Sequence, residues 1–210
     1  MTYNIKVFKF SNIFSLANLV GITWNLDKEI KSRVLYYASC LAYSFHILYK
    51  TNYHRIICEK NTLISFLASR DESKKNPLNI IYLLFCFLSI FVMIFYKDGR
   101  SILTYQLGYN KTLDLMVKEN NQKYDAELVL FITHPAYQGK GYGKSLLNEF
   151  HNFMKEQNKC NIYLFTDNYC DYSMYDRAGC IRKNEKVREF YFLAGERFTQ
   201  ELYLYDYKIN

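Results

Sequence analysis

The 210-residue sequence predicts a mixed α/β fold, in which helices flank a central mixed sheet. Three consecutive features predict it. An apolar run over residues 128–133 has the length of a buried strand. A loop with three glycines at alternate positions follows over residues 138–144. After the loop, apolar residues recur at the spacing of one helix face, at Leu146, Leu147, Phe150 and Met154.

The glycine loop predicts a phosphate site. Gly139, Gly141 and Gly143 let backbone N–H groups approach a ligand without interference from a Cβ atom. The helix that begins there adds unsatisfied N–H donors and the positive end of its dipole. A Walker loop does not fit, because the first glycine stands four residues before Gly143 instead of five. The dinucleotide fingerprint fails because the glycines are equally spaced.

The pattern Gln138-x-x-Gly141-x-Gly143 resembles the pyrophosphate loop of the GNAT acyltransferases, which bind acetyl-CoA. A second motif agrees with it. A strand-like run over residues 161–166 is followed by Asn168 and by the ending Tyr175-Asp176-Arg177-Ala178-Gly179-Cys180, where Cys180 replaces the usual phenylalanine. The resemblance covers about residues 127–182 and implies a GNAT fold. Its sheet would be splayed between residues 127–133 and 161–166.

The resemblance also implies the activity and the cofactor site. The expected reaction is transfer of an acetyl group from acetyl-CoA to a primary amine, by direct attack in a ternary complex. The resemblance assigns the pantetheine arm to backbone groups of Phe131, Ile132 and Thr133 and to the side chain of Asn168. It assigns the pyrophosphate to the glycine loop, and the expected binding residues there are Gln138, Gly139, Lys140, Gly141, Tyr142, Gly143 and Lys144. A solvated side chain is the alternative for both lysines.

Two catalytic residues follow from the same resemblance. Tyr175 matches the tyrosine that protonates the thiolate of CoA, and a phenol with a pKa of about 10 can donate to a thiolate of similar basicity. Glu127 matches a glutamate that acts as a base in histone-acetylating members. The alternatives are a core aromatic for Tyr175, with Tyr172 as its substitute, and a solvated strand-start residue for Glu127. A nucleophilic pair of Cys170 and His151 lacks any activating neighbour in the sequence.

The rest of the chain predicts the remaining elements of the same sheet. A strand over residues 3–7, helices over about 11–24 and 28–50, and strands over 53–58 and 62–69 form the first half. The second helix is expected to bury Ile30, Val34, Ala38, Leu41, Phe45 and Leu48. Residues 59–61 and 194–196 are expected to be hairpin turns, the latter between strands over residues 188–193 and 198–207.

Residues 71–122 depart from the family pattern and are expected to be a helical insertion within a single domain of residues 1–210. Residues 78–96 are almost wholly apolar, and their length of roughly 19 residues meets the threshold for a membrane span. We expect a helical hairpin whose first helix is buried. Contact with a membrane surface, a true span and a homodimer interface are the alternatives.

The amino-acid composition excludes some classes of function but does not identify an activity. The net charge of +7 suits an anionic cofactor, and no arginine-rich or basic-aromatic stripe predicts nucleic-acid binding. The six cysteines make no C-x-x-C pair, so we expect no metal site and a cytoplasmic protein with reduced thiols. Two other functions stay open, a GNAT-fold protein that binds or senses acyl-CoA without transfer, and a membrane-associated acyltransferase.

Overall fold

The computed structural model describes residues 3–60, 62–71, 73–74, 78–191, 193 and 197–209. Within them, a seven-stranded sheet has the order β1-β2-β3-β4-β5-β7-β6. Only β4 and β5 pair in parallel among the described strands. The strands are β1 (Ile5–Val7), β2 (Tyr53–Glu59), β3 (Thr62–Asp71), β4 (Ala126–Thr133), β5 (Asn161–Asp167), β6 (Ile181–Tyr191) and β7 (Arg197–Lys208). The predicted mixed α/β class is confirmed.

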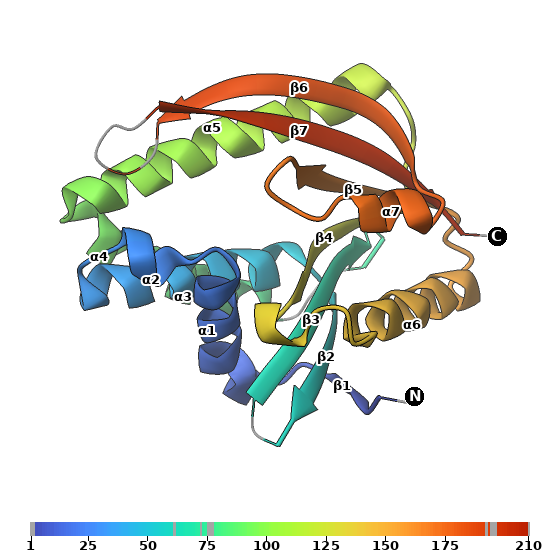
Figure 1. The fold of residues 1–210 in the computed structure, drawn as a ribbon, viewed down its shortest axis with the longest axis horizontal. Helices are drawn as coiled ribbons and strands as arrows, with labels where there is room; N and C mark the ends of the chain where they lie inside the picture. Colours follow the sequence, from blue (N-terminus) through green and yellow to red (C-terminus); the bar gives the residue numbers. More distant parts are fainter. Residues whose placement is uncertain are drawn as a thin grey trace.

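Helices cover both faces of this sheet (Figure 1). One core lies under α6, and on the opposite face α1 and α3 cover β2, β3 and β4, while α5 runs along β6 and β7. The helices are α1 (Ile13–Thr23), α2 (Leu26–Glu29), α3 (Arg33–Lys50), α4 (Asn79–Ile94), α5 (Lys97–Asn120), α6 (Tyr142–Glu156) and α7 (Ser173–Arg177). Two short 3-10 turns precede α1 and α6, η1 (Phe10–Asn12) and η2 (Pro135–Tyr137).

Strand β4 changes phase at Val129. Ala126 and Leu128 belong to the core under α6, whereas Leu130 and Ile132 belong to the core under α1 and α3. In a regular strand these alternate residues would share one face. The pairing with β3 shows the cause, because consecutive residues of β3 oppose Leu128 and Leu130 and skip Val129. Val129 is therefore the extra residue of a β-bulge.

The sheet opens beyond this bulge. Strands β4 and β5 pair only from Ala126–Ile162 to Leu128–Leu164, while β5 stays paired with β7 as far as Asp167. A bulge bends its strand and increases its twist, which carries the end of β4 away from β5. The predicted splay between the two strands is confirmed.

The predicted helix over residues 28–50 is two helices. Ile30 is extended, with φ −101° and ψ 101°, and separates α2 from α3. The Ser32 hydroxyl then accepts a hydrogen bond from the backbone N–H of Leu35 at 3.4 Å and caps α3. Val34 lies in the first turn of α3 and is 57% exposed instead of buried, so the prediction for Val34 was wrong.

The C-terminal hairpin is present but starts earlier than predicted. Strand β6 begins at Ile181 instead of residue 188 and pairs with β7 in antiparallel register as far as Tyr191 opposite Arg197. The predicted turn over residues 194–196, and Asn61 of the turn between β2 and β3, lie outside the described residues.

Helix α4 is not buried as predicted. Only Tyr82, Cys86 and Met93 are buried along this helix, which is described throughout. It packs mainly against α3 and α5, with Phe10 of η1 beside Tyr82 and Phe85, and no other described layer covers its outer face. An apolar sequence therefore gave a helix with one packed side and one exposed apolar side.

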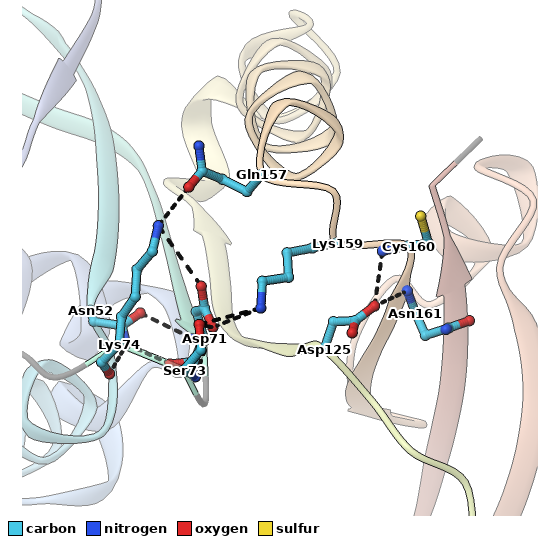
Figure 2. Close-up of polar contacts among 9 residues, drawn as sticks. All are labelled: Asn52, Asp71, Ser73, Lys74, Asp125, Gln157, Lys159, Cys160 and Asn161. Carbon is cyan, nitrogen blue, oxygen red and sulfur yellow. Dashed lines mark hydrogen bonds and ion pairs between the residues drawn. The ribbon is translucent and has the colours of Figure 1, made fainter.

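Polar contacts join the end of β3 to neighbouring segments of the chain (Figure 2). The carboxylate of Asp71 is buried and accepts hydrogen bonds from the Ser73 backbone N–H at 2.9 Å and from the Ser73 hydroxyl at 2.6 Å. The Lys159 ammonium lies 3.4 Å from the same carboxylate. Beside them, Asp125 accepts hydrogen bonds from the backbone N–H groups of Cys160 and Asn161. Burial acts to raise the pKa of Asp71, but the Ser73 donors and Lys159 together outweigh it and lower this pKa.

We expect Asp71→Asn to lower the free energy of unfolding by about 1–3 kcal/mol at pH 7, because the Ser73 donors and Lys159 lose the ionised form of their buried acceptor. The folded-state pKa of Asp71 is lowered, so its stabilisation is present above the unfolded-state pKa of about 3.9 and is lost as the pH falls through the folded-state value. Denaturant unfolding should therefore show a difference at pH 7 that shrinks in acid. Asp171→Asn, at an exposed carboxylate, is the control and should change stability little. A pH-independent difference would contradict this account.

Candidate active site

The glycine loop joins β4 to α6. Gly139 and Gly141 have φ values of +74° and +88°, which lie in the left-handed region that favours glycine. Gly141 is the N-cap of α6, so the first unsatisfied N–H groups of this helix follow it directly. A Cβ on Gly139 would meet no described atom within 4 Å. The loop therefore presents backbone donors on an open surface, as phosphate binding requires.

The N-terminal strand region holds this loop. The Tyr3 hydroxyl donates a hydrogen bond to the Lys140 carbonyl, and the Tyr3 ring lies 4.3 Å from the Tyr142 ring, measured between centroids. The Tyr142 hydroxyl in turn donates to the Glu59 carboxylate. The side chain of Tyr142 thus lies in the core and leaves its backbone N–H at the loop. Sequence reasoning missed Tyr3 and Glu59, because both lie at least 80 positions from the residues they bind.

The start of α6 lies directly against the end of β4. A Cβ on Gly143 would be 3.2 Å from Cζ of Phe131 and 3.4 Å from Oγ1 of Thr133, so glycine permits the close approach. The Gln138 side chain donates to the Thr133 carbonyl at 3.4 Å and ties the loop to the same strand. Lys140 is exposed, with its ammonium 4.8 Å from the Tyr137 ring centre.

At the end of β4, the side chains of residues 131–133 are packed or hydrogen-bonded, so the backbone is the part that can contact a ligand. Ile132 is buried in the core under α1 and α3, and Phe131 is packed against the core under α6. The Thr133 hydroxyl is within 2.8 Å of the Ser65 hydroxyl. Because pairing with β5 ends at Leu128, the backbone edge of residues 131–133 borders the splay. A ligand in the splay would meet peptide groups there.

Tyr175 lies in α7, buried in the core under α6. Burial raises the pKa of its phenol, and the nearby Cys170, Cys180 and Asp171 raise it further. The pKa of the buried Cys180 thiol is also raised, to about 12, chiefly by burial. Tyr175 and Cys180 therefore hold their protons at neutral pH, and Cys180 is not a thiolate nucleophile there. The Cys170 side chain is exposed.

Glu127 lies on the opposite face of the sheet from Tyr175. Its carboxylate is 2.9 Å from the Arg70 guanidinium and accepts a hydrogen bond from the Tyr163 hydroxyl at 3.1 Å. Tyr163 belongs to the core under α5, whereas Tyr175 belongs to the core under α6. A cavity of about 340 Å³ borders Arg70 and Tyr163 on this side. Glu127 is thus placed beside the bulge at Val129, already in an ion pair.

Asn168 is engaged with β7. Its backbone N–H donates to the Glu201 carbonyl at 3.1 Å, and its side-chain oxygen accepts from the Glu201 backbone N–H at 3.0 Å. These two bonds extend the pairing of β5 with β7 by one residue. The side-chain amide NH₂ of Asn168 is the group left to meet a ligand.

A group of tyrosines that the sequence motifs missed surrounds the end of β5. The Tyr105 hydroxyl donates to the Gln200 side-chain oxygen at 3.0 Å, and the Gln200 amide donates to the Asp167 carboxylate at 2.8 Å. Burial raises the pKa of Tyr43, and interactions with Tyr105, Cys170 and Asp167 raise it further. Tyr43 is packed against the core under α1 and α3. These residues come from α3, α5, β5 and β7, so no local spacing could have predicted them.

The histidines do not assemble a nucleophilic site. His151 is 2.9 Å from the Tyr207 hydroxyl, and His134 accepts a hydrogen bond from the Ala136 backbone N–H. In the part of the chain that the structure describes, no three His, Cys, Asp or Glu residues are grouped as metal ligands would be. No described helix combines the length and the apolar character that crossing a membrane requires.

Known proteins match both the motifs and the fold. Residues 96–180 match the Acetyltransferase (GNAT) family. The ribosomal-protein-S18-alanine N-acetyltransferase of Escherichia coli superposes with a TM-score of 0.53 at 8% identity, covering 100% of this chain and 95% of the other. An N-acetyltransferase of Staphylococcus aureus gives 0.54 at 10% identity and covers 100% of both chains. A Streptococcus mutans protein gives 0.55 at 12% identity over 99% of both chains. No curated protein matches the sequence.

These likenesses extend the motif match to the whole fold. At such identities they show a shared architecture, and the GNAT fold predicted from the two motifs is confirmed. The roles of the individual site residues are therefore argued from the contacts in this structure and not from the matched proteins.

We expect Gly143→Val to lower the free energy of unfolding by about 1–3 kcal/mol, because the added methyl groups would press on Phe131 and Thr133. Gly108→Val is the matched control in α5, where a Cβ would lie 3.6 Å from Phe190 in ordinary contact and the change should stay below about 1 kcal/mol. Phe131→Leu should relieve part of the cost in the Gly143→Val background. Equal destabilisation at both glycines in denaturant unfolding would refute the close approach of α6 to β4.

Proposed function

We propose that the chain is a GNAT acetyltransferase, whose family model matches residues 96–180, and that it transfers an acetyl group from acetyl-CoA to a primary amine. The observation that carries the proposal is the splay between β4 and β5, which opens beyond Leu128 and faces the glycine loop at the start of α6. The proposal treats residues 1–210 as one domain and residues 71–122, with α4 and α5, as an insertion within it.

The donor would bind in two parts. The pyrophosphate would accept hydrogen bonds from backbone N–H groups of residues 139–143, where open space and the helix N-terminus favour an anion. Lys140 and Lys144 are exposed at this loop and would add positive charge. The pantetheine arm would lie in the splay along the backbone of residues 131–133, with the Asn168 amide NH₂ on the opposite side.

The reaction would be direct. The neutral amine nitrogen attacks the thioester carbonyl carbon, the new C–N bond forms, and the C–S bond breaks. The departing thiolate takes a proton from the Tyr175 hydroxyl, and the nitrogen loses its extra proton to a base. The raised pKa of the buried Cys180 thiol disfavours an acyl-cysteine intermediate at that residue, because this thiol does not ionise near neutral pH.

Burial suits Tyr175 to the role of acid. A raised pKa keeps its proton in place at neutral pH, although it also makes the phenol a weaker acid. The leaving thiolate would form in similar desolvated surroundings, which raise the pKa of the buried Cys180 thiol to about 12. Donor and acceptor are therefore shifted in the same direction, and proton transfer between them stays feasible.

The acceptor would approach from the face that α5 covers. Glu127, Tyr43 and Tyr105 all belong to this face, and the carboxylate of Glu127 is the candidate base. This carboxylate is already engaged, since it lies 2.9 Å from the Arg70 guanidinium and accepts a hydrogen bond from the Tyr163 hydroxyl. That engagement is the observation that favours the other function, binding of acyl-CoA without transfer.

Tyr175→Phe should lower turnover by about 10²–10⁴-fold while acetyl-CoA binding stays unchanged, because only the proton donor is removed. The measurement is CoA thiol release in the presence of a panel of primary amines, together with calorimetric binding of acetyl-CoA. Tyr172→Phe, one helical turn earlier, is the matched control and should keep nearly full activity.

The two functions then separate. Binding of acetyl-CoA with no turnover on any amine would support the sensing protein and overturn the enzyme. Loss of turnover in Tyr172→Phe, with Tyr175→Phe fully active, would transfer the acid role to Tyr172.

A further inference from the structure

Helix α4 presents a wide apolar face to solvent. Residues 78–96 contain no charged side chain. Along the helix, eight apolar side chains are between 37% and 77% exposed, namely Ile80, Ile81, Leu84, Phe85, Phe87, Leu88, Phe91 and Ile94. Soluble monomers rarely expose a contiguous apolar patch larger than a few hundred Å². An exposed face of this kind requires an occupant.

The face continues onto the N-terminal region. The ring of Phe10, 44% exposed, lies 5.8 Å from the ring of Phe85 and 6.3 Å from that of Tyr82. We call Phe10 together with the eight exposed α4 side chains the α4 face. Two segments that are far apart in the sequence therefore build one surface.

The inner side of α4 is fixed to the protein. The Cys86 thiol donates to the Ala42 carbonyl at 3.5 Å, Phe85 stacks on Phe45 at 5.2 Å, and Met93 packs in the same cluster as Leu35. With 16 residues, α4 is about 24 Å long, shorter than the roughly 30 Å of a bilayer's hydrocarbon core. The helix could thus lie along a lipid surface, with α3 taking the place of the polar side that an isolated interfacial helix carries.

Positive charge borders the α4 face at both ends. The C-terminal end of α4 meets the start of α3, since Met93 and Leu35 pack together there. The segments 27–33 and 97–100 at this end hold five basic residues and three acidic ones. At the other end Lys9 precedes Phe10, and residues 3–26 contain no acidic side chain.

We propose that the α4 face docks on an anionic lipid surface, with α4 lying at the boundary between headgroups and acyl chains. Each basic residue at the border would then face lipid phosphates. A second copy of the chain fits less well, because two α4 faces would bring positive ends together in either orientation. The face also lacks the polar side chains that set the register of a self-complementary contact. This inference is independent of the proposed acetyl transfer.

The test is co-sedimentation of the intact protein with phosphatidylcholine vesicles, with and without phosphatidylglycerol. We expect binding to the anionic vesicles that weakens as salt is raised. The double variant Phe87→Asp/Phe91→Asp should bind at least about 100-fold more weakly, because two apolar rings no longer enter the lipid. Val187→Asp is the matched control, since Val187 is 64% exposed on β6, away from this face.

A second variant tests the charges. Lys31→Gln/Arg33→Gln should weaken binding to the anionic vesicles by about ten-fold or more. Absence of sedimentation with either vesicle would overturn the proposal, and so would equal binding to both. A concentration-dependent dimer in light scattering, dissociated by Phe87→Asp/Phe91→Asp, would assign the face to a second copy instead.

Discussion

The site depends on one extra residue in a strand. Val129 interrupts the pairing of β4 with β3, moves the later residues of β4 from one core to the other, and is followed by the end of pairing with β5. Without this bulge, Leu130 and Ile132 would face α6 and the two central strands would stay joined. The opened sheet has the backbone groups of residues 131–133 along one wall. That arrangement can hold an extended ligand between two strands.

The anion-binding loop depends on long-range contacts that its own sequence does not supply. Glycine at positions 139 and 141 allows the backbone turn, but Tyr3, Tyr142 and Glu59 hold the turn against the ends of β1 and β2. Near the C-terminal end of α6, the network around Asp71 joins the end of β3 to Lys159 in the segment after this helix. Helix α6 is thus fixed at both ends, and its N-terminus is held against β4.

Local pattern predicted most of the elements, because the apolar runs of β3, β4 and β5 and the period of α6 match their burial. It misjudged positions where tertiary context decides. Periodicity continued a helix that in the structure ends at Glu29 and starts again after the Ser32 cap, and Val34 in the first turn of α3 is exposed. An apolar segment predicted a buried helix, yet α4 has partners on one side only. The glycine loop begins α6 and residues 131–133 border the splay, but Glu127 and Tyr175 lie on opposite faces of the sheet. The tyrosines of α3 and α5 come from separate segments that no spacing connects.

Calorimetric titration with acetyl-CoA and with S-acetylpantetheine tests the central claim most directly, because the two ligands differ in the pyrophosphate and nucleotide that the loop is proposed to hold. We expect acetyl-CoA to bind with a Kd of about micromolar order, and S-acetylpantetheine to bind at least about ten-fold more weakly. In Gly141→Trp, where φ is +88°, binding of acetyl-CoA should fall to the level of the shorter ligand. Equal affinities for both ligands, or no binding to a folded wild type, would show that the loop is only a turn.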